Sequence, residues 1–200
     1  MIISSDIIAQ LREKTGAGIM NCKKALQKSQ GNFEKAAAIL REEGAALASK
    51  KASRSSQEGL IFSYIHTGGK LGVILELNCE TDFVARTDEF KNLAQEIAMQ
   101  VAAANPQGIS RKDIPAETIE REREIYVNQC VNEKKPENII PRIVDGKIEK
   151  YFEHICLLDQ AYIRDSSGKT KVKDLITNAI GKLGENISVR RFTRFQLGGE

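Results

Sequence analysis

The stretch Val73–Arg86 reads VILELNCETDFVAR and contains the end of one element and the approach to the next. Its first half alternates apolar side chains with others, which is typical of a β-strand with one buried face. Its second half, Cys79–Arg86, is a turn that places an acidic residue, Asp82, beside a large aromatic one, Phe83. A phenylalanine at a turn is costly in water, so either the fold buries Phe83 or a partner receives it. Because most phenylalanines are buried, the residues alone favour an account in which Asp82 caps a helix and Phe83 joins the core.

The residues on either side of this stretch predict the other two strands of a sheet. Residues 60–67 are rich in β-branched and aromatic side chains, and Gly68-Gly69 suits the positive φ angles of a tight hairpin. A last apolar alternation, from Ile187 to Phe195, predicts a third strand that joins the hairpin. The order of strands and helices predicts an α+β fold, with a three-stranded antiparallel sheet packed against helices.

Helical spacing dominates the rest of the core. Thr87 is a suitable cap for a helix whose apolar face runs from Phe90 to Val101. Pro115 opens a further amphipathic segment, and residues 136–158 and 171–183 also have helical spacing. Gly184 ends the last of these helices.

The first fifty residues predict three short helices. Ser4, Ser5 or Asp6 is suited to cap the first, the glycines of Thr15–Gly18 end it, and Asn32 is the expected cap of the third. Residues 49–57 are polar and basic with no large apolar side chain. We therefore predict a three-helix domain over residues 1–50, a linker over 51–57 and an α+β core over 58–200.

Composition excludes several classes of protein. The 200 residues are 41% hydrophobic and 28% charged, with a net charge of only +3, which does not demand a nucleic-acid partner. No signal peptide or membrane span is evident, so a cytoplasmic protein is expected. The four cysteines are widely spaced without a CxxC pair, so neither a metal site nor a cofactor is expected, and the thiols are expected to be buried.

Two patterns are of a kind found in enzymes, but neither is accompanied by the other residues that such a site needs. Residues 166–170 (SSGKT) resemble the end of a phosphate-binding loop, but Ile163 stands where that motif needs its first glycine, so a surface turn is the better interpretation. His66 and His154 are the only histidines, and neither has a nucleophile or metal-ligand spacing nearby. Catalysis at either place remains a remote alternative.

Basic residues keep a nucleic-acid hypothesis open. Residues 190–195 (RRFTRF) interleave arginine with phenylalanine, and Lys50, Lys51 and Arg54 lie near the predicted linker. An RNA-binding module would use such groups. The alternative, which we favour, is a strand whose arginine stems cover apolar surface.

Ile19 and Met20 follow the Thr15–Gly18 turn directly. Adjacent helical positions point about 100° apart, so a thin three-helix domain cannot bury both well. One of them is expected to face outward as a partner contact, although packing of both against neighbouring elements is an equal alternative.

Three stretches together resemble a known family. Residues 11–26 (LREKTGAGIMNCKKAL), 78–86 (NCETDFVAR) and 184–191 (GENISVRR) are similar, in this order, to the signatures of bacterial elongation factor Ts. They extend over nearly the whole chain. The resemblance implies a ubiquitin-associated-like fold for the N-terminal helices, followed by a dimerisation-type core in a single copy, as in the short forms of the family.

The resemblance also implies a function. It predicts a non-enzymatic guanine-nucleotide exchange factor that binds GDP-bound elongation factor Tu in translation elongation. Thr81, Asp82, Phe83 and Val84 match the element that disturbs the partner's Mg²⁺ site, which reverses the expectation of a buried Phe83. Arg12, Ile19 and Met20 match the N-terminal contact surface. A homodimer is expected within the complex with the partner, and neither a membrane nor a direct nucleic-acid role is expected.

The chain departs from the family at two positions. Ile19 and Asn21 stand where the family usually has methionine and aspartate. Ile19 keeps an apolar contact, whereas Asn21 lacks the charge that an ion pair with the partner would need.

Overall fold

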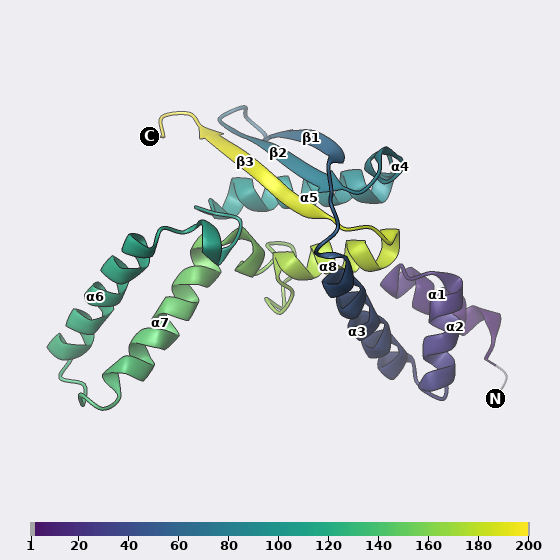
Figure 1. Cartoon of the computed structure of the whole chain (residues 1–200), viewed down its shortest axis with the longest axis horizontal. Coiled ribbons are helices and arrows are strands. Elements are labelled where there is room, and N and C mark those ends of the chain that lie inside the picture. The colour runs from purple at the N-terminus through teal and green to yellow at the C-terminus, as the bar shows by residue number, and fades with distance from the viewer. Residues whose placement is uncertain (1–2, 200) are drawn as a thin grey trace. The chain divides into compact units, whose positions relative to one another are not determined.

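The computed structural model describes residues 3–199 and has the predicted α+β fold (Figure 1). Its strands are β1 (Glu58–Ile65), β2 (Leu71–Cys79) and β3 (Ser188–Gln196), which form one antiparallel sheet in the order β1-β2-β3. Its helices are α1 (Ser5–Thr15), α2 (Ile19–Lys28), α3 (Phe33–Lys51), α4 (Asp82–Ala85), α5 (Asp88–Ala104), α6 (Ala116–Asn132), α7 (Ile140–Ile155) and α8 (Val172–Leu183). Two short 3-10 turns complete it, η1 (Arg111–Asp113) and η2 (Leu157–Asp159).

The chain divides into two compact units, each built from separate stretches of sequence. The first contains the residues up to Ile61, Glu76–Ala94 and Asp174–Arg190. The second contains Phe62–Leu75, Gln95–Lys173 and the residues from Arg191 onward. The linker predicted over residues 51–57 overlaps the last residue of α3 and the segment before β1, and the domain boundary stays a prediction.

The first three helices have a core of their own within the first unit. Buried residues from all three make up that core: Leu11, Cys22, Ala25, Leu26 and Ala36. The caps agree with the sequence, since Ser4 accepts from the backbone N–H of Ile7 and Asn32 Oδ1 accepts from Lys35 N at 2.9 Å.

The sheet follows the predicted alternation. Val73, Leu75 and Leu77 of β2 are buried, while Ile74 between them is exposed. Gly68 and Gly69 have φ angles of +94° and +70° in the predicted hairpin turn. The guanidinium of Arg194 on β3 donates through Nε to the carbonyl oxygen of Ala102 on α5 at 3.1 Å, so this arginine is used inside the fold.

The helices α6 and α7 form an antiparallel hairpin in the second unit (Figure 1). Cys130, Val144 and Ile148 are buried between them. At the base of the hairpin, Arg111 donates two hydrogen bonds to Glu149 and one to Asp159. These bonds, to Glu149 first, raise the pKa of the Arg111 guanidinium, which therefore keeps its charge.

The four cysteines are buried as free thiols, as expected. No helix among residues 3–199 is long and apolar enough to cross a lipid bilayer.

Glycine is required at Gly59, where β1 passes β2. Its φ angle is +148°, and a Cβ there would overlap the carbonyl oxygen of Leu77. We predict that Gly59→Ala lowers the free energy of unfolding by about 2 kcal/mol, because the β2 backbone cannot move aside without losing sheet hydrogen bonds.

Gly146, exposed in α7, provides the matched control, since a Cβ there meets no atom within 4 Å. Gly146→Ala should raise the free energy of unfolding by about 0.5–1 kcal/mol, because alanine is the better helix former. Chemical denaturation of both variants measures the two effects, and equal effects would contradict the assignment of a special role to Gly59.

Candidate functional site

The turn that follows β2 begins a helix of one turn, α4 (Figure 1). Thr81 is its N-cap, with the side-chain oxygen accepting from Val84 N at 3.5 Å. Asp82 is the first residue of the helix, so the alternative that made Asp82 the cap is wrong. Thr87 then caps α5, as predicted, by accepting from Phe90 N at 3.3 Å.

Phe83 projects from α4 with 78% of its surface exposed. The alternative that placed Phe83 in the core is therefore wrong. Its neighbour Ala85 is buried and faces the opposite way, which anchors the turn. The carboxylate of Asp82 accepts from Arg86 Nη2 at 2.7 Å, in an ion pair one helical turn apart. A large aromatic ring and an adjacent carboxylate thus extend from the surface at a fixed place.

Glu80 and Glu185, which we call the carboxylate pair, hold the backbone that leads into this turn. Glu185 accepts from Glu80 N at 3.1 Å, from Thr81 N at 3.0 Å and from the Thr81 hydroxyl at 2.6 Å. In return, Glu80 accepts from Asn186 N at 2.7 Å. Each glutamate therefore binds the backbone beside the other, and together they join the end of β2 to the segment before β3.

The basic residues near the predicted linker bind this same pair. Lys51 and Arg54 lie 3.5 and 3.3 Å from the Glu80 carboxylate, and Lys51 also donates to the carbonyl oxygen of Gly184. The hydrogen bond from Asn186 and then these two cations hold the pKa of Glu80 below its usual range. Two of the three basic residues of the nucleic-acid hypothesis in this region thus form ion pairs with a carboxylate of the chain itself.

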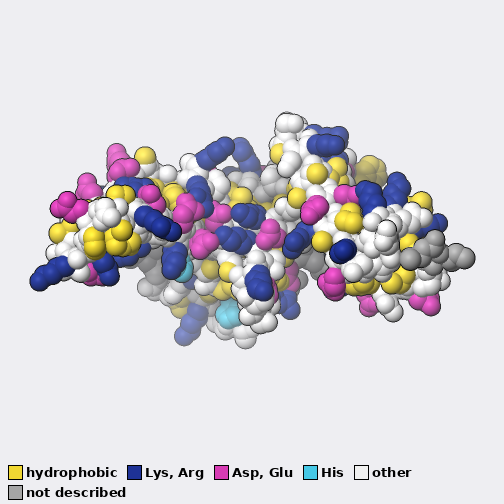
Figure 2. All heavy atoms as spheres, turned by 90° about the horizontal axis from the view of Figure 1, so that it is seen from below, with side chains coloured by type: hydrophobic (Ala, Val, Ile, Leu, Met, Phe, Trp, Pro, Cys, Tyr) yellow, Lys and Arg dark blue, Asp and Glu magenta, His cyan; other side chains and the backbone are white. Residues whose placement is uncertain are grey.

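Surface charges give that hypothesis no further support. On the face shown in Figure 2, basic and acidic side chains are interspersed, without a continuous basic field. On β3, Phe192 is half-buried and Arg194 binds the Ala102 carbonyl oxygen, which agrees with the interpretation of a strand covered by arginine stems.

The polar groups near the turn do not form a catalytic centre. Cys79 donates through Sγ to the carbonyl oxygen of Thr81, and burial, then the charge of Glu185, raises the pKa of its thiol to about 11. A thiol with that pKa stays protonated and is a poor nucleophile near pH 7. His66 bonds to the Tyr64 hydroxyl, and His154 is exposed in the last turn of α7. Within residues 3–199, no three His, Cys, Asp or Glu side chains are grouped to hold a metal ion.

Residues 166–170 form a turn around Asp165, in agreement with the interpretation as a surface turn. The Asp165 carboxylate accepts from the backbone N–H groups of Ser167 and Thr170 and from the Ser167 hydroxyl. These amides are bound to a carboxylate of the chain itself, so they do not form a phosphate-binding loop.

The N-terminal predicted contacts all lie on the surface. Ile19 and Met20 are 54% and 61% exposed, so both face outward instead of one of them. Arg12 is also exposed, and Arg12 and Ile19 line a groove of about 530 Å³. The structure thus makes all three residues available, while their role as contacts stays a prediction.

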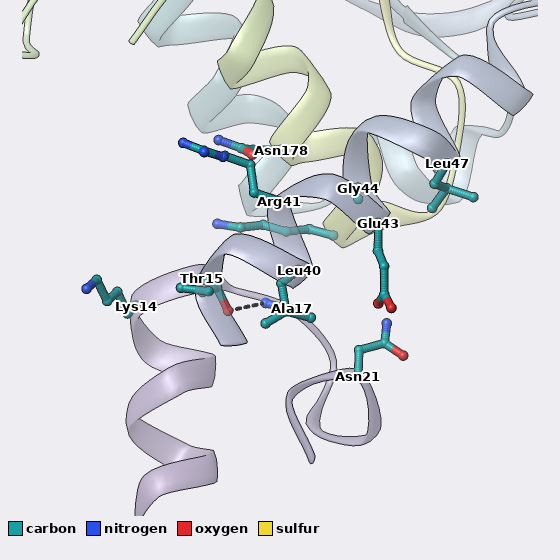
Figure 3. Close-up of a pocket in the computed structure, with 13 residues that line it drawn as sticks. Lys14, Thr15, Ala17, Asn21, Leu40, Arg41, Glu43, Gly44, Leu47 and Asn178 are labelled. Atoms are coloured by element: carbon teal, nitrogen blue, oxygen red, sulfur yellow. Dashed lines mark hydrogen bonds between the residues drawn. The ribbon is translucent and has the colours of Figure 1, made fainter. Parts of the chain in front are cut away.

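Gly16 fixes the turn that directs these residues. It has a φ of +68°, and a Cβ at this position would overlap the side chain of Lys182 from α8. Figure 3 shows the neighbouring hydrogen bond from Ala17 N to the Thr15 side chain, 3.3 Å long, at the edge of a 340 Å³ pocket. In the same view Asn21 points toward Glu43.

Comparison with known proteins establishes the family. The family model described as Elongation factor TS matches residues 4–171. Elongation factor Ts of Thermoanaerobacter sp. (strain X514) is 58% identical over 197 residues, which cover 98% of this chain and 96% of that protein. Elongation factor Ts of Thermodesulfovibrio yellowstonii is 59% identical over 198 residues, or 99% of this chain and 98% of that protein. The chain belongs to the elongation factor Ts family and is a translation elongation factor.

The sequence did not predict the carboxylate pair. Glu80 and Glu185 lie at the edges of the second and third signatures, which is the one signal that associates them. Their separation of 105 residues, however, gives no periodic pattern that would place them together.

The lowered pKa of Glu80 gives a prediction for stability against pH. A carboxyl whose pKa is lower in the folded state stabilises the fold above its unfolded pKa, about 4.3, and loses this effect as the pH falls through the folded value. We expect wild-type protein to exceed Glu80→Gln in unfolding temperature at pH 7, with a difference that shrinks steadily below about pH 4.3. Thermal unfolding from pH 7 to pH 3 measures this.

The control is Glu34→Gln in α3. It removes a carboxylate whose side chain is 79% exposed. A difference between wild type and Glu80→Gln that is the same at pH 7 and pH 3 would show that the charge of Glu80 does not stabilise the fold.

Proposed function

We propose that this chain is a guanine-nucleotide exchange factor for elongation factor Tu, acting in the cytoplasm. The observation that carries the proposal is the exposure of Phe83 on a turn whose backbone is held by Glu185. A large apolar side chain kept in water on a rigid support is typical of an anchor that a partner's pocket receives. Family membership supports elongation factor Tu as that partner.

In the proposed mechanism the turn acts as a wedge. Asp82 and Phe83 enter the partner near its nucleotide site and displace the loop that supports Mg²⁺, with Thr81 and Val84 forming the rest of the element. Mg²⁺ neutralises the phosphates of the bound nucleotide, so weakening its site favours release of GDP. Coupling between two ligands is reciprocal, so GTP binding in turn displaces the factor. No bond is broken, and the chain acts as a binding protein, not an enzyme.

The N-terminal helices provide the second contact in this proposal. Residues 1–50 dock through Arg12, Ile19 and Met20, and residues 58–200 form the core that carries the wedge. Asn21 lacks the charge of an aspartate, so the proposed docking rests on apolar contact and on Arg12. Two contacts on one chain raise the effective concentration of the wedge at its target.

We further propose that the chain forms a homodimer through the open face of its sheet. Within the second unit, the bonds from His66 N to Leu71 O and from Leu197 N to Lys70 O set the register. By this register Ile65 and Phe195 lie on either side of Gly72, in one row across the sheet. The Ile65 side chain reaches over Gly72 and takes the space that a side chain there would need, so this row presents the exposed apolar groups of Ile65 and Phe195.

The next row of the same face carries an exposed apolar side chain, Ile74. Ile65, Ile74 and Phe195 thus form an exposed apolar strip on one face of the sheet. A two-fold axis between two copies would pack this strip against its counterpart, because a symmetric dimer uses the same patch on both subunits.

For the wedge, we predict that Phe83→Ala slows the release of fluorescent GDP from elongation factor Tu by about 30-fold, because removal of an anchor costs roughly 2 kcal/mol or more. Asp82→Ala should also slow release. Both variants should unfold within about 0.5 kcal/mol of wild type, since the Phe83 ring is exposed and the Asp82–Arg86 pair lies at the surface.

Ile163→Ala, which truncates another exposed apolar side chain, is the control and should release GDP at the wild-type rate. Wild-type rates in Phe83→Ala and Asp82→Ala together would rule out the wedge. Loss of the fold in Phe83→Ala would restore the account of Phe83 as a core residue.

For the dimer, we predict that Ile65→Glu and Ile74→Glu each convert the protein to a monomer, because either change places a charge in an apolar interface. Sedimentation equilibrium measures the mass. Ile163→Glu, with the same chemical change at an exposed site outside the sheet, should remain dimeric. A wild-type protein that is monomeric at tens of micromolar would contradict the homodimer.

A further inference from the structure

We propose that Glu185 is a positioning residue for nucleotide exchange, and that Thr81 acts through Glu185 instead of through the partner. The inference rests on the proposed function and deepens it. It divides the four-residue element into two parts, with Thr81 turned inward to the carboxylate and Asp82 and Phe83 turned outward to the partner.

The Thr81 hydroxyl points toward Glu185. It donates its one proton to Glu185 at 2.6 Å and accepts the N–H of Val84 at 3.5 Å. A hydroxyl has a single donor, so Thr81 has none to offer to a partner. The Glu185 bond also fixes the side-chain rotation that points the accepting lone pairs at Val84, which is the geometry of the helix cap.

The helix α4 is too short to fix its own direction. A helix of four residues is far below the length that is stable alone in water, so its direction depends on its end contacts. Phe83 cannot supply such a contact, since it is 78% exposed. At the start of the helix the contact is Glu185, through Thr81, and at its end the Thr87 hydroxyl donates to Val84 O at 2.8 Å.

The backbone on both sides of Glu185 is held by hydrogen bonds. Its neighbour Asn186 donates its backbone N–H to Glu80 and its side-chain amide to the carbonyl oxygen of Arg54, at 2.8 Å. Lys51 donates to the carbonyl oxygen of Gly184, on the other side of Glu185. A carboxylate on a fixed backbone directs its bonds, so Glu185 sets where the turn begins.

A residue that only contributed stability would give a different result from a positioning residue. Loss of stability alone would leave the folded fraction fully active. Loss of position leaves the fold and the docking contacts intact and reduces the chance that Asp82 and Phe83 meet their target, so the maximal rate of GDP release falls while the half-saturating concentration is nearly unchanged.

The test compares Glu185→Gln with Asp165→Asn. Both carboxylates accept two backbone N–H groups and at least one hydroxyl, but Asp165 is bound by the turn of residues 166–170, far along the chain from the proposed wedge. At a temperature where both variants are folded by circular dichroism, release of fluorescent GDP from elongation factor Tu is timed over a range of factor concentrations.

We expect Glu185→Gln to lower the maximal rate about tenfold, the effect of weakening charge-assisted hydrogen bonds, and to change the half-saturating concentration by less than about twofold. Asp165→Asn should keep the wild-type rate. Amide hydrogen exchange of the free factor should become faster at Glu80 and Thr81 in Glu185→Gln and stay unchanged in Asp165→Asn. Wild-type rate and protection in Glu185→Gln would overturn the inference.

Thr81→Val decides the assignment of Thr81. It removes the hydroxyl that Glu185 binds and should lower the maximal rate about as much as Glu185→Gln, with no further loss when the two changes are combined. Losses that add in the double variant, or a raised half-saturating concentration in Thr81→Val alone, would show direct contact of Thr81 with the partner and overturn the inference even if Glu185→Gln failed to fold.

Failure of the proposed function gives a separate result. If Phe83→Ala releases GDP at the wild-type rate, the wedge is wrong, and the hydrogen-exchange comparison still reports whether Glu185 holds the turn. If Phe83→Ala is slow while Glu185→Gln is not, the positioning role alone is wrong.

Discussion

The structure around the proposed site depends on two carboxylates, each of which accepts hydrogen bonds from the backbone beside the other. Glu185 binds the backbone at Glu80 and Thr81, and Glu80 binds the backbone at Asn186. Backbone N–H groups at the end of a strand are unpaired unless some acceptor meets them, and a buried unpaired group would be costly. Each carboxylate accepts backbone N–H groups that lie beside the other carboxylate. The end of β2, the segment before β3 and the start of α4 are therefore held together.

In this arrangement the charged side chains pair with one another and are not presented to a ligand. Lys51 and Arg54 neutralise Glu80, and Cys79 beside them stays a protonated thiol. What the turn presents to solvent is an aromatic ring and one carboxylate that is paired with Arg86. Such a surface suits binding by shape and burial, and the chain that carries it belongs to a family of translation elongation factors.

Close approaches and backbone angles at glycines are the second constraint on this fold. Gly59 lies against the carbonyl oxygen of Leu77, so a side chain there would displace backbone, whereas Gly16 faces only the flexible end of the Lys182 side chain and is favoured by its φ of +68°. Gly72 differs, because the space above it is covered by Ile65 of the same face. The first two glycines fix the backbone of the first unit, while the third shapes an apolar surface on the second.

Most helices and strands of this protein could be predicted from the residues, because the signals for them are local. Alternation predicted β2, paired glycines predicted the hairpin turn, and Asn32 and Thr87 predicted helix starts through bonds that extend only three residues. The three signatures predicted the family. The resemblance also predicted, against the local pattern, that Phe83 faces outward, and Phe83 is exposed in the structure. Tertiary structure alone decided that Thr81 and not Asp82 is the cap, and that the Glu185 carboxylate binds the backbone of Glu80, 105 residues away. The physical reason is that burial and distant hydrogen bonds depend on which surfaces the folded chain brings together, and no local pattern records that.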